Sequence, residues 1–134
     1  IGQAPPSAIQ IVPYDTTLLY DMLNWVNISK EEAQRMFDFE AVSNVFPGAT
    51  KEGHKKPSKE DCDKHWVSTL ENKIISSDKV ILLGNFARNY FYSQPKTWSC
   101  NLQVLELIHP SRRNYNKIMD NKESIVNKLK EFLF

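Results

Sequence analysis

The sequence is short of cysteine, of long apolar runs and of excess charge, and each shortage excludes a class of protein. Only two of its 134 residues are cysteines, too few for a four-cysteine metal site or a disulfide-rich secreted scaffold. No apolar run approaches the roughly 18 residues that cross a bilayer, and no signal peptide opens the chain. With 17 basic and 16 acidic side chains, the net charge neither indicates nor excludes binding to nucleic acid. We therefore expect a cytoplasmic monomer without a membrane partner.

Three common catalytic signatures are also missing. The chain has no P-loop and no dinucleotide-binding fingerprint, which argues against an enzyme that uses a phosphate-bearing cofactor. No glycines surround Ser111, as a nucleophile elbow would require. A hydrolase built from Ser111, His109 and an acid therefore stays only as a third alternative.

The length and the 41% hydrophobic content predict one domain, residues 1–134, with a single sizeable core. Ile1 and Gly2 have the character of the end of a strand that runs into a loop. We therefore expect that an N-terminal strand of the natural protein precedes this sequence.

Apolar periodicity predicts helices that alternate with strands. The run Lys79–Gly84 is apolar and closes on glycine, which is typical of a strand buried on both faces of a parallel sheet. Residues 102–107 alternate as another strand, and residues 87–91 indicate a helix between the two. This order predicts a three-layer α/β/α domain with a mostly parallel central sheet. Helical stripes are formed by Leu18, Leu19, Met22, Leu23, Trp25 and Val26, by Cys62, Trp66, Leu70 and Ile74, and by Ile125, Leu129 and Phe132.

Several local features complete the expected architecture. Ser29 and Glu32 form a capping-box signature for a helix that continues to Met36. Residues 39–45 are rich in aromatic and branched side chains and predict a strand, whereas the polar residues 50–57 predict an exposed loop. Ser58 is an expected N-cap. We interpret Trp25 and Trp66 as core residues and His65 as a surface residue.

Ligands of parallel sheets bind beyond the carboxyl ends of the strands. His109-Pro110-Ser111 follows the predicted strand 102–107 and precedes Arg112 and Arg113. Proline stiffens the turn, serine can bond to the turn backbone, and the arginines can bind phosphate. This loop is therefore a candidate site, together with the loops 2–15 and 47–57.

Five motifs in order resemble the uracil-DNA glycosylase superfamily, most of all its bacterial branches related to the iron–sulfur family. The resemblance covers nearly the whole chain. Its motifs are Gly2-Gln3-Ala4-Pro5-Pro6, Pro13-Tyr14, Phe46-Pro47-Gly48 followed by Pro57-Ser58-Lys59-Glu60 and Cys62, Leu82-Leu83-Gly84 with Ala87, and His109-Pro110-Ser111 with Arg113-Asn114.

The resemblance implies an enzyme that flips uracil or another damaged base out of single- or double-stranded DNA and hydrolyses its glycosidic bond. His109 would donate a hydrogen bond to the leaving base, with Ser111 in support, and Tyr14 would stack on that base. Arg113 would fill the gap left in the DNA. Arg112, Lys117, Lys55 and Lys56 would bind phosphates, although a solvated loop is the competing interpretation for the last two. Such a protein would act at the bacterial nucleoid.

The sequence departs from the family pattern at the first motif. The position of the aspartate in one branch is Ala4, and the glutamate of the iron–sulfur branch is replaced by Gln3. Asp15 is the nearest substitute carboxylate, although it also suits the N-terminus of a helix. We take Gln3 and Asp15 as catalytic candidates and Ala4 as a base contact.

A second departure concerns the base. The asparagine with which the superfamily often binds uracil corresponds to Ala41, and Asn44 is the nearest asparagine. We take Asn44 as a base-binding candidate. The iron–sulfur branch needs four cysteines, and Val45 stands at one of their positions, so we expect no cluster and no other cofactor or metal. The alternative is a catalytically degenerate protein that binds DNA or a partner on the same fold.

Overall fold

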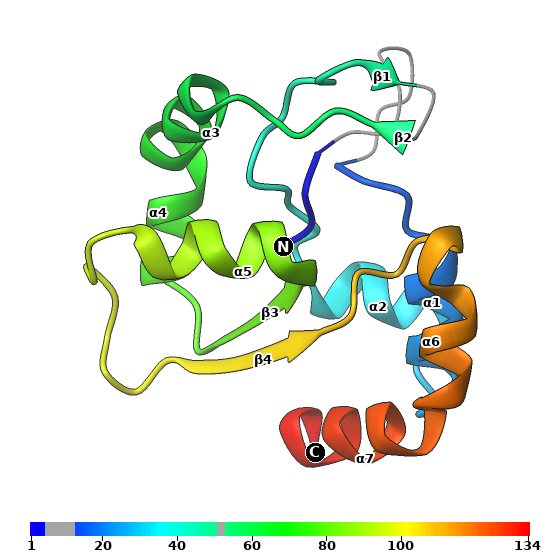
Figure 1. Cartoon of the computed structure of the whole chain (residues 1–134). Helices are drawn as coiled ribbons and strands as arrows, with labels where there is room; N and C mark the ends of the chain where they lie inside the picture. The colour runs from blue at the N-terminus through cyan, green and yellow to red at the C-terminus, as the bar shows by residue number, and fades with distance from the viewer. Residues whose placement is uncertain (5–12, 51–52) are drawn as a thin grey trace.

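The centre of the fold is a pair of parallel strands, β3 (Lys79–Leu83) and β4 (Gln103–Leu107). This computed structural model describes residues 1–4, 13–50 and 53–134. For residues 49, 50, 53 and 54 it describes the backbone and not the side chains. β3 and β4 pair in register from Lys79 with Gln103 to Leu83 with Leu107. Both strands therefore end at the same edge of the molecule (Figure 1).

Two shorter extended segments continue the hydrogen bonding beyond β3. The backbone of Ile1 bonds to Ile81 O (2.5 Å) and accepts from Leu83 N (2.9 Å). Gly2 in turn donates to Glu40 O (2.8 Å) and accepts from Val42 N (3.0 Å), a parallel bridge centred on Ala41. These four parallel segments thus lie in the order residues 40–42, residues 1–2, β3 and β4.

Helices connect and cover these strands. The connections between consecutive parallel segments must return to the opposite edge, which helices do efficiently. Ser29 caps α2 through its bond from Glu32 N, and Ser58 caps α3 through its bond from Asp61 N, as the sequence predicted. The helical elements are α1 (Thr17–Asn24), α2 (Lys30–Met36), α3 (Lys59–His65), the π-helix η1 (Trp66–Leu70), α4 (Glu71–Ile75), α5 (Gly84–Ser93), the 3-10 helix η2 (Arg112–Asn114), α6 (Tyr115–Asp120) and α7 (Lys122–Leu133).

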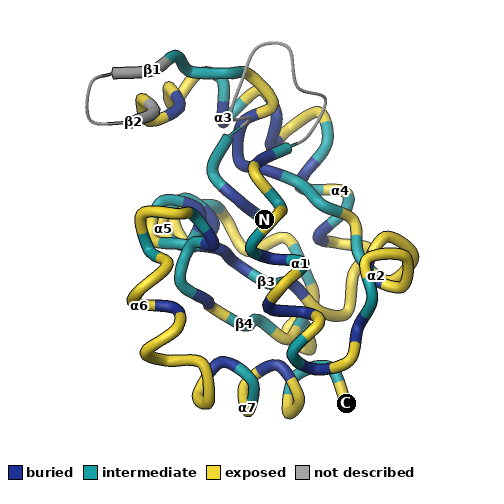
Figure 2. The backbone as a smooth tube through the Cα atoms, turned by 90° about the vertical axis from the view of Figure 1, so that its right-hand side faces the viewer, coloured by how far each residue is buried: buried dark blue, intermediate teal, exposed yellow. Residues whose placement is uncertain are grey.

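Apolar side chains of β3 alternate between two clusters. Val80 and Leu82 join a cluster with residues of η1, α4 and α5, whereas Leu83 joins a cluster with residues of α1, α6 and α7. Such alternation is expected of a strand that is covered on both faces. Figure 2 shows β3 as a largely buried segment, whereas α7 alternates between buried and exposed residues. The α/β class predicted from the sequence is confirmed.

The segment α3–η1–α4 keeps one apolar stripe buried. Cys62, Trp66, Leu70 and Ile74 are 0–4% exposed. In a straight α-helix, each step of four residues rotates about 40° past a full turn, and three steps would drift by about 120°. The wider turn of η1 reduces this drift, which explains how residues at a constant spacing of four all face the core. The predicted stripe is confirmed, and Trp66 is a core residue.

Three local predictions were wrong. The strand predicted over 39–45 is paired only around Ala41, because the Ser43 side chain accepts a bond from Val45 N (3.1 Å) and turns the chain. Within the predicted loop 50–57, two short strands pair, β1 (Ala49–Thr50) and β2 (Gly53–His54). His65 is not on the surface: it is buried and bonds to Glu40.

No helix in the described part of the chain is both long and apolar enough to span a membrane.

Candidate active site

The parallel segments end together at one edge of the sheet. Gln3 follows the first segment, Ser43 follows the second, Gly84 follows β3, and His109 lies just beyond β4. Ser43 N donates to Gln3 O (3.4 Å), so the first two ends stay in contact. Because ligands of parallel sheets bind at this edge, residues that the sequence separates by more than 100 positions share one candidate site.

His109 packs against the first residue of α5. Gly84 has φ +87°, a conformation that side-chain-bearing residues rarely adopt. A Cβ atom added to Gly84 would lie 2.7 Å from the Cβ of His109 and 3.3 Å from its ring Cδ2. Glycine at position 84 therefore lets the chain turn directly from β3 into α5 and leaves the space that His109 occupies.

A short hydrogen-bonded turn fixes the backbone of His109. Its carbonyl accepts from Ser111 N (2.8 Å) and from the side-chain amide of Asn114 (3.0 Å). Asn114 N donates to Ser111 O (3.0 Å), and Pro110 is fully buried. The turn contains the expected buried proline, whereas the bond that the Ser111 side chain could make to the turn backbone is not seen, because Ser111 Oγ has no partner among the described residues. Asn114 is a supporting residue that the sequence argument named only as part of a motif.

Ser111 carries a buried hydroxyl on the same turn as His109. Its Oγ is inaccessible to solvent and has no hydrogen-bond partner among the described residues. A buried hydroxyl without a partner costs free energy on the order of 1–3 kcal/mol. An unpaired buried group in a native structure calls for an explanation such as a bound water or ion, so Ser111 stays a candidate for contact with a ligand at this edge.

His109 is held in its neutral form. Burial lowers the pKa of His109 below its ordinary value of 6.5, the positive charge of Arg113 lowers it further, and Asp15 opposes the shift. The structure therefore brings Arg113 and Asp15 close enough for their charges to act on the imidazole. A neutral imidazole carries one N–H donor and one acceptor, so at neutral pH His109 can donate a hydrogen bond without carrying a charge.

Asp15 also stabilises the start of α1. Its Oδ1 accepts from Thr17 N (3.1 Å), and the side chain is exposed. Asp15 thus bonds to the start of α1 and also lies close enough to His109 for its charge to act on the imidazole.

Tyr14 lies deeper than the predicted stacking role requires. Its side chain is 3% exposed, and a Cβ atom added to Gly2 would lie 2.4 Å from its ring. Burial raises the pKa of the Tyr14 phenol. A base can stack on this ring only if the covering chain moves away, so the role stays a prediction.

The remaining base contacts differ in location. Gln3 and Ala4 lie at the sheet edge and are half-buried, whereas Pro5 and Pro6 fall outside the described residues. Asn44 is exposed and lines a shallow hollow with residues of α3 and η1 such as Asp63 and Ser68. His109 does not line that hollow, so the role of Asn44 as a base contact stays a prediction.

The predicted phosphate-binding residues are exposed cations. Arg112 and Arg113 belong to η2, Lys117 to α6, and Lys55 and Lys56 follow β2. Within the described ranges, none of the five forms an ion pair, whereas Lys59, Lys64, Lys73 and Arg88 do. Cations that lack protein partners remain available for phosphate groups.

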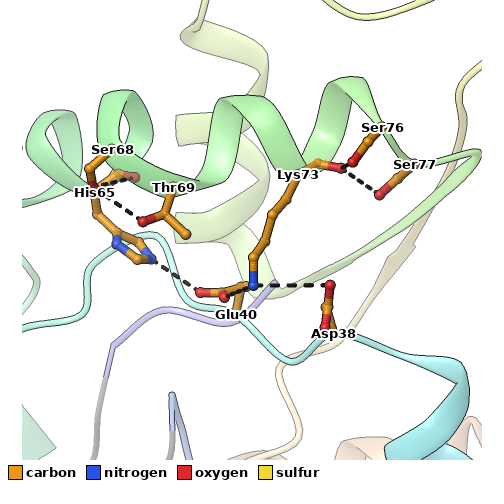
Figure 3. Close-up of polar contacts among 8 residues, drawn as sticks. All are labelled: Asp38, Glu40, His65, Ser68, Thr69, Lys73, Ser76 and Ser77. Atoms are coloured by element: carbon orange, nitrogen blue, oxygen red, sulfur yellow. Dashed lines mark hydrogen bonds and ion pairs between the residues drawn. The ribbon is translucent and has the colours of Figure 1, made fainter.

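A charge cluster centred on the part-buried Glu40 was missed by the sequence argument. Glu40 accepts from Lys73 Nζ (2.5 Å) and meets His65 Nε2 (3.2 Å), while Asp38 lies 4.0 Å from Lys73 (Figure 3). The bond to Glu40 raises the pKa of Lys73. The cluster ties residues 38–40 to α3 and α4 and so supports the segment that pairs with Gly2. Long-range pairs of this kind leave no periodic signal in a sequence.

No group of three or more metal-ligating side chains gathers in the part of the chain that the structure describes.

Comparison with known proteins gives one family. The model of the uracil DNA glycosylase superfamily matches residues 1–132 of the chain. No curated protein sequence matches the chain.

Proposed function

The chain belongs to the uracil DNA glycosylase superfamily, and from this premise we propose that it is a DNA glycosylase that extrudes uracil or another damaged base and hydrolyses its N-glycosidic bond. We propose for it a three-layer α/β/α fold, which the two apolar clusters on alternate sides of β3 support. Members of the superfamily act on DNA, and the partner proposed here is DNA that carries a damaged base.

One observation carries this proposal: the His109 imidazole and a buried Ser111 hydroxyl that no described residue bonds lie on the same turn, at the edge of the sheet where ligands of parallel sheets bind. When the bond between C1′ and the base nitrogen breaks, its electron pair leaves with the base, and negative charge collects on the base carbonyl oxygens. The N–H of His109 would donate to such an oxygen and stabilise that charge, with Ser111 beside it. Removing one donor of this type typically costs about 100- to 1,000-fold in rate.

On the sugar side, the reaction needs a group that stabilises the positive charge of the sugar and a group that positions the attacking water. The carboxylate of Asp15 would stabilise the positive charge on the sugar and accept the proton of the attacking water. Gln3, at the end of the first extended segment, would orient that water through its amide. The released base anion would take up a proton from solvent, which completes the hydrolysis.

DNA would be held from the same edge. Arg112, Lys117, Lys55 and Lys56 would bind phosphates, and Arg113 would occupy the space left by the extruded base. Tyr14, Ala4 and Asn44 complete the proposed base contacts, with Tyr14 requiring the rearrangement described above.

A second candidate is a protein that binds DNA or a partner but no longer cleaves. Two observations favour it: Gln3 and Ala4 leave the first motif without a carboxylate, and the Asp15 carboxylate already accepts a bond from Thr17 N at the start of α1.

An assay of base release separates the two. Single- and double-stranded oligonucleotides that carry uracil, hypoxanthine or xanthine are incubated with the protein, and free base is detected by mass spectrometry. Release of one base by the wild type and not by His109→Ala supports the glycosylase. Retained DNA binding without release from any substrate favours the non-cleaving protein.

A further inference from the structure

Two large apolar side chains are exposed side by side on α6. Tyr115 is 50% exposed, and Met119, which follows four residues later, is 38% exposed. Side chains separated by four positions lie on the same face of a helix. The pair therefore presents an aromatic ring and a flexible thioether to solvent, and we call it the Tyr115–Met119 face.

Unpaired positive charge lies at the N-terminal end of this face. Arg112 and Arg113 belong to η2, which immediately precedes α6. Both are exposed and form no ion pair with any residue that the structure describes. Lys117 is two positions from both Tyr115 and Met119 and so lies on another face of α6, and the acidic Asp120 follows Met119 at the other end. An apolar face with cations at one end suits a polyanion that carries flat, stackable groups.

The face has a fixed position relative to His109. Tyr115 directly follows Asn114, whose side chain and backbone bond to His109 O and Ser111 O. In Figure 1, the chain leaves β4 at the edge where both strands end and reaches α6 after the connection that contains His109 and η2. The backbone of Tyr115, on the first turn of the helix, is therefore held next to the turn that carries His109.

We propose that Tyr115 is a stacking platform for an unpaired base that neighbours the extruded one, and that the protein consequently binds single-stranded DNA in preference to duplex. This inference rests on the proposed function, because it takes the extruded base to lie at His109. A base in a duplex has both faces covered by its neighbours, whereas a single strand offers a free face to the ring. Stacking of one base on an aromatic side chain contributes enough that its loss costs about 10-fold in affinity.

The test measures binding and stacking separately. Fluorescence anisotropy gives the affinity for a single-stranded oligonucleotide with a tetrahydrofuran abasic site and for the same sequence as a duplex. In a second oligonucleotide, 2-aminopurine stands beside the abasic site, and its quenching reports stacking. The variants are Tyr115→Ala, Tyr115→Leu, which keeps apolar bulk without a ring, and Tyr115→Phe, which keeps the ring. Tyr92→Ala is the matched control, because Tyr92 is 53% exposed on α5, near the end of that helix remote from Gly84.

We expect Tyr115→Ala and Tyr115→Leu to lose about 10-fold in single-strand affinity together with the quenching, while Tyr115→Phe and Tyr92→Ala keep both. Duplex affinity should change less. Thermal melts identify any variant that does not fold, and Tyr115→Leu decides the matter if Tyr115→Ala does not fold.

The proposal is overturned if Tyr115→Leu binds the single strand as the wild type does, or loses affinity for single strand and duplex equally. The proposal is also overturned if binding to vesicles of phosphatidylserine and phosphatidylcholine depends on Tyr115 while binding to DNA does not. That result would assign the face to a membrane surface. Base release is measured on the same variants. Ring-dependent single-strand binding without base release refutes the glycosylase and leaves the stacking role of Tyr115 standing, whereas base release together with single-strand binding that is independent of Tyr115 refutes the platform alone.

Discussion

Gly84 is the residue whose geometry most directly shapes the candidate site. Gly84→Ala would place a methyl group 2.7 Å from the Cβ of His109, in a backbone conformation with φ +87°. We expect a loss of about 1–3 kcal/mol in the free energy of unfolding, measured by urea denaturation, and a displaced His109 with impaired base release.

Gly48→Ala is the matched control for this change. Gly48 has a similar φ of +99°, but the nearest atom to an added Cβ is a side-chain carbon of Lys55 at 3.6 Å. This variant should lose comparable stability and keep its activity. Equal losses of activity in both variants would show that strain in general, and not the space beside His109, is what matters.

The neutral state of His109 has a consequence for stability against pH. Its pKa in the folded protein lies below 6.5, so the unfolded chain takes up a proton first as the pH falls. Folding then becomes less favourable through this window, until the pH drops below the pKa of the folded state.

We therefore expect the wild type to lose stability between pH 7 and pH 5 more steeply than His109→Asn, which has no proton to bind there. Urea denaturation at several pH values measures the difference. A steeper loss in His109→Asn would contradict a lowered pKa, and an NMR titration of the imidazole gives the pKa itself.

At the scale of elements, the sequence predicted those that depend on local pattern. The stripe of α7, the apolar run of β3 and the caps at Ser29 and Ser58 are local features, and all are confirmed. The segment 39–45 was predicted too long because its composition suits a strand, whereas the Ser43 side chain ends the pairing. His65 was misplaced because its partner Glu40 comes from another element.

The link between the outer segment and the helices can be tested through Glu40. Its side chain is 19% exposed and is shared by His65 and Lys73. Glu40→Gln removes the charge that both partners meet, and we expect a loss of about 1–3 kcal/mol in the free energy of unfolding. The same residue accepts the Gly2 backbone bond, so protection of the Gly2 amide against hydrogen exchange should also fall.

Asp38→Asn is the control, because Asp38 faces the same lysine from 4.0 Å and is 79% exposed. Exposed pairs of this kind contribute little, and its stability should equal that of the wild type. A loss in Asp38→Asn as large as in Glu40→Gln would mean that the net charge around Lys73, and not the buried bond, supports the segment.

At the scale of the whole molecule, the site is a product of topology. The candidates His109 and Arg113 and the resemblance to a family could be inferred from short motifs, each made of residues near each other in the sequence. The contact of His109 with Gly84 and the proximity of Asp15 could not, because they arise where separate parallel segments end together. The burial of Tyr14 could not be predicted either, because its packing against Gly2 leaves no sequence pattern.

A net charge of +1 means that DNA affinity must come from a local group of cations. Each phosphate contact on a single strand contributes about 0.7 to the slope of log K against log salt. Arg112→Ala should therefore flatten that slope by about 0.7, whereas Lys128→Ala, an exposed cation on α7, should leave it unchanged. Equal slopes in both variants would place the phosphate contacts elsewhere.

The central claim is that His109, at the edge of the sheet, makes this protein a glycosylase. The most direct measurement is the single-turnover rate of base release, with protein in excess over single-stranded oligonucleotides that carry uracil, hypoxanthine or xanthine. We expect release of at least one base, slowed about 100- to 1,000-fold in His109→Ala while DNA binding and the melting temperature are retained. Release at the same rate in His109→Ala, or no release from any substrate by a folded protein that binds the DNA, would contradict the claim.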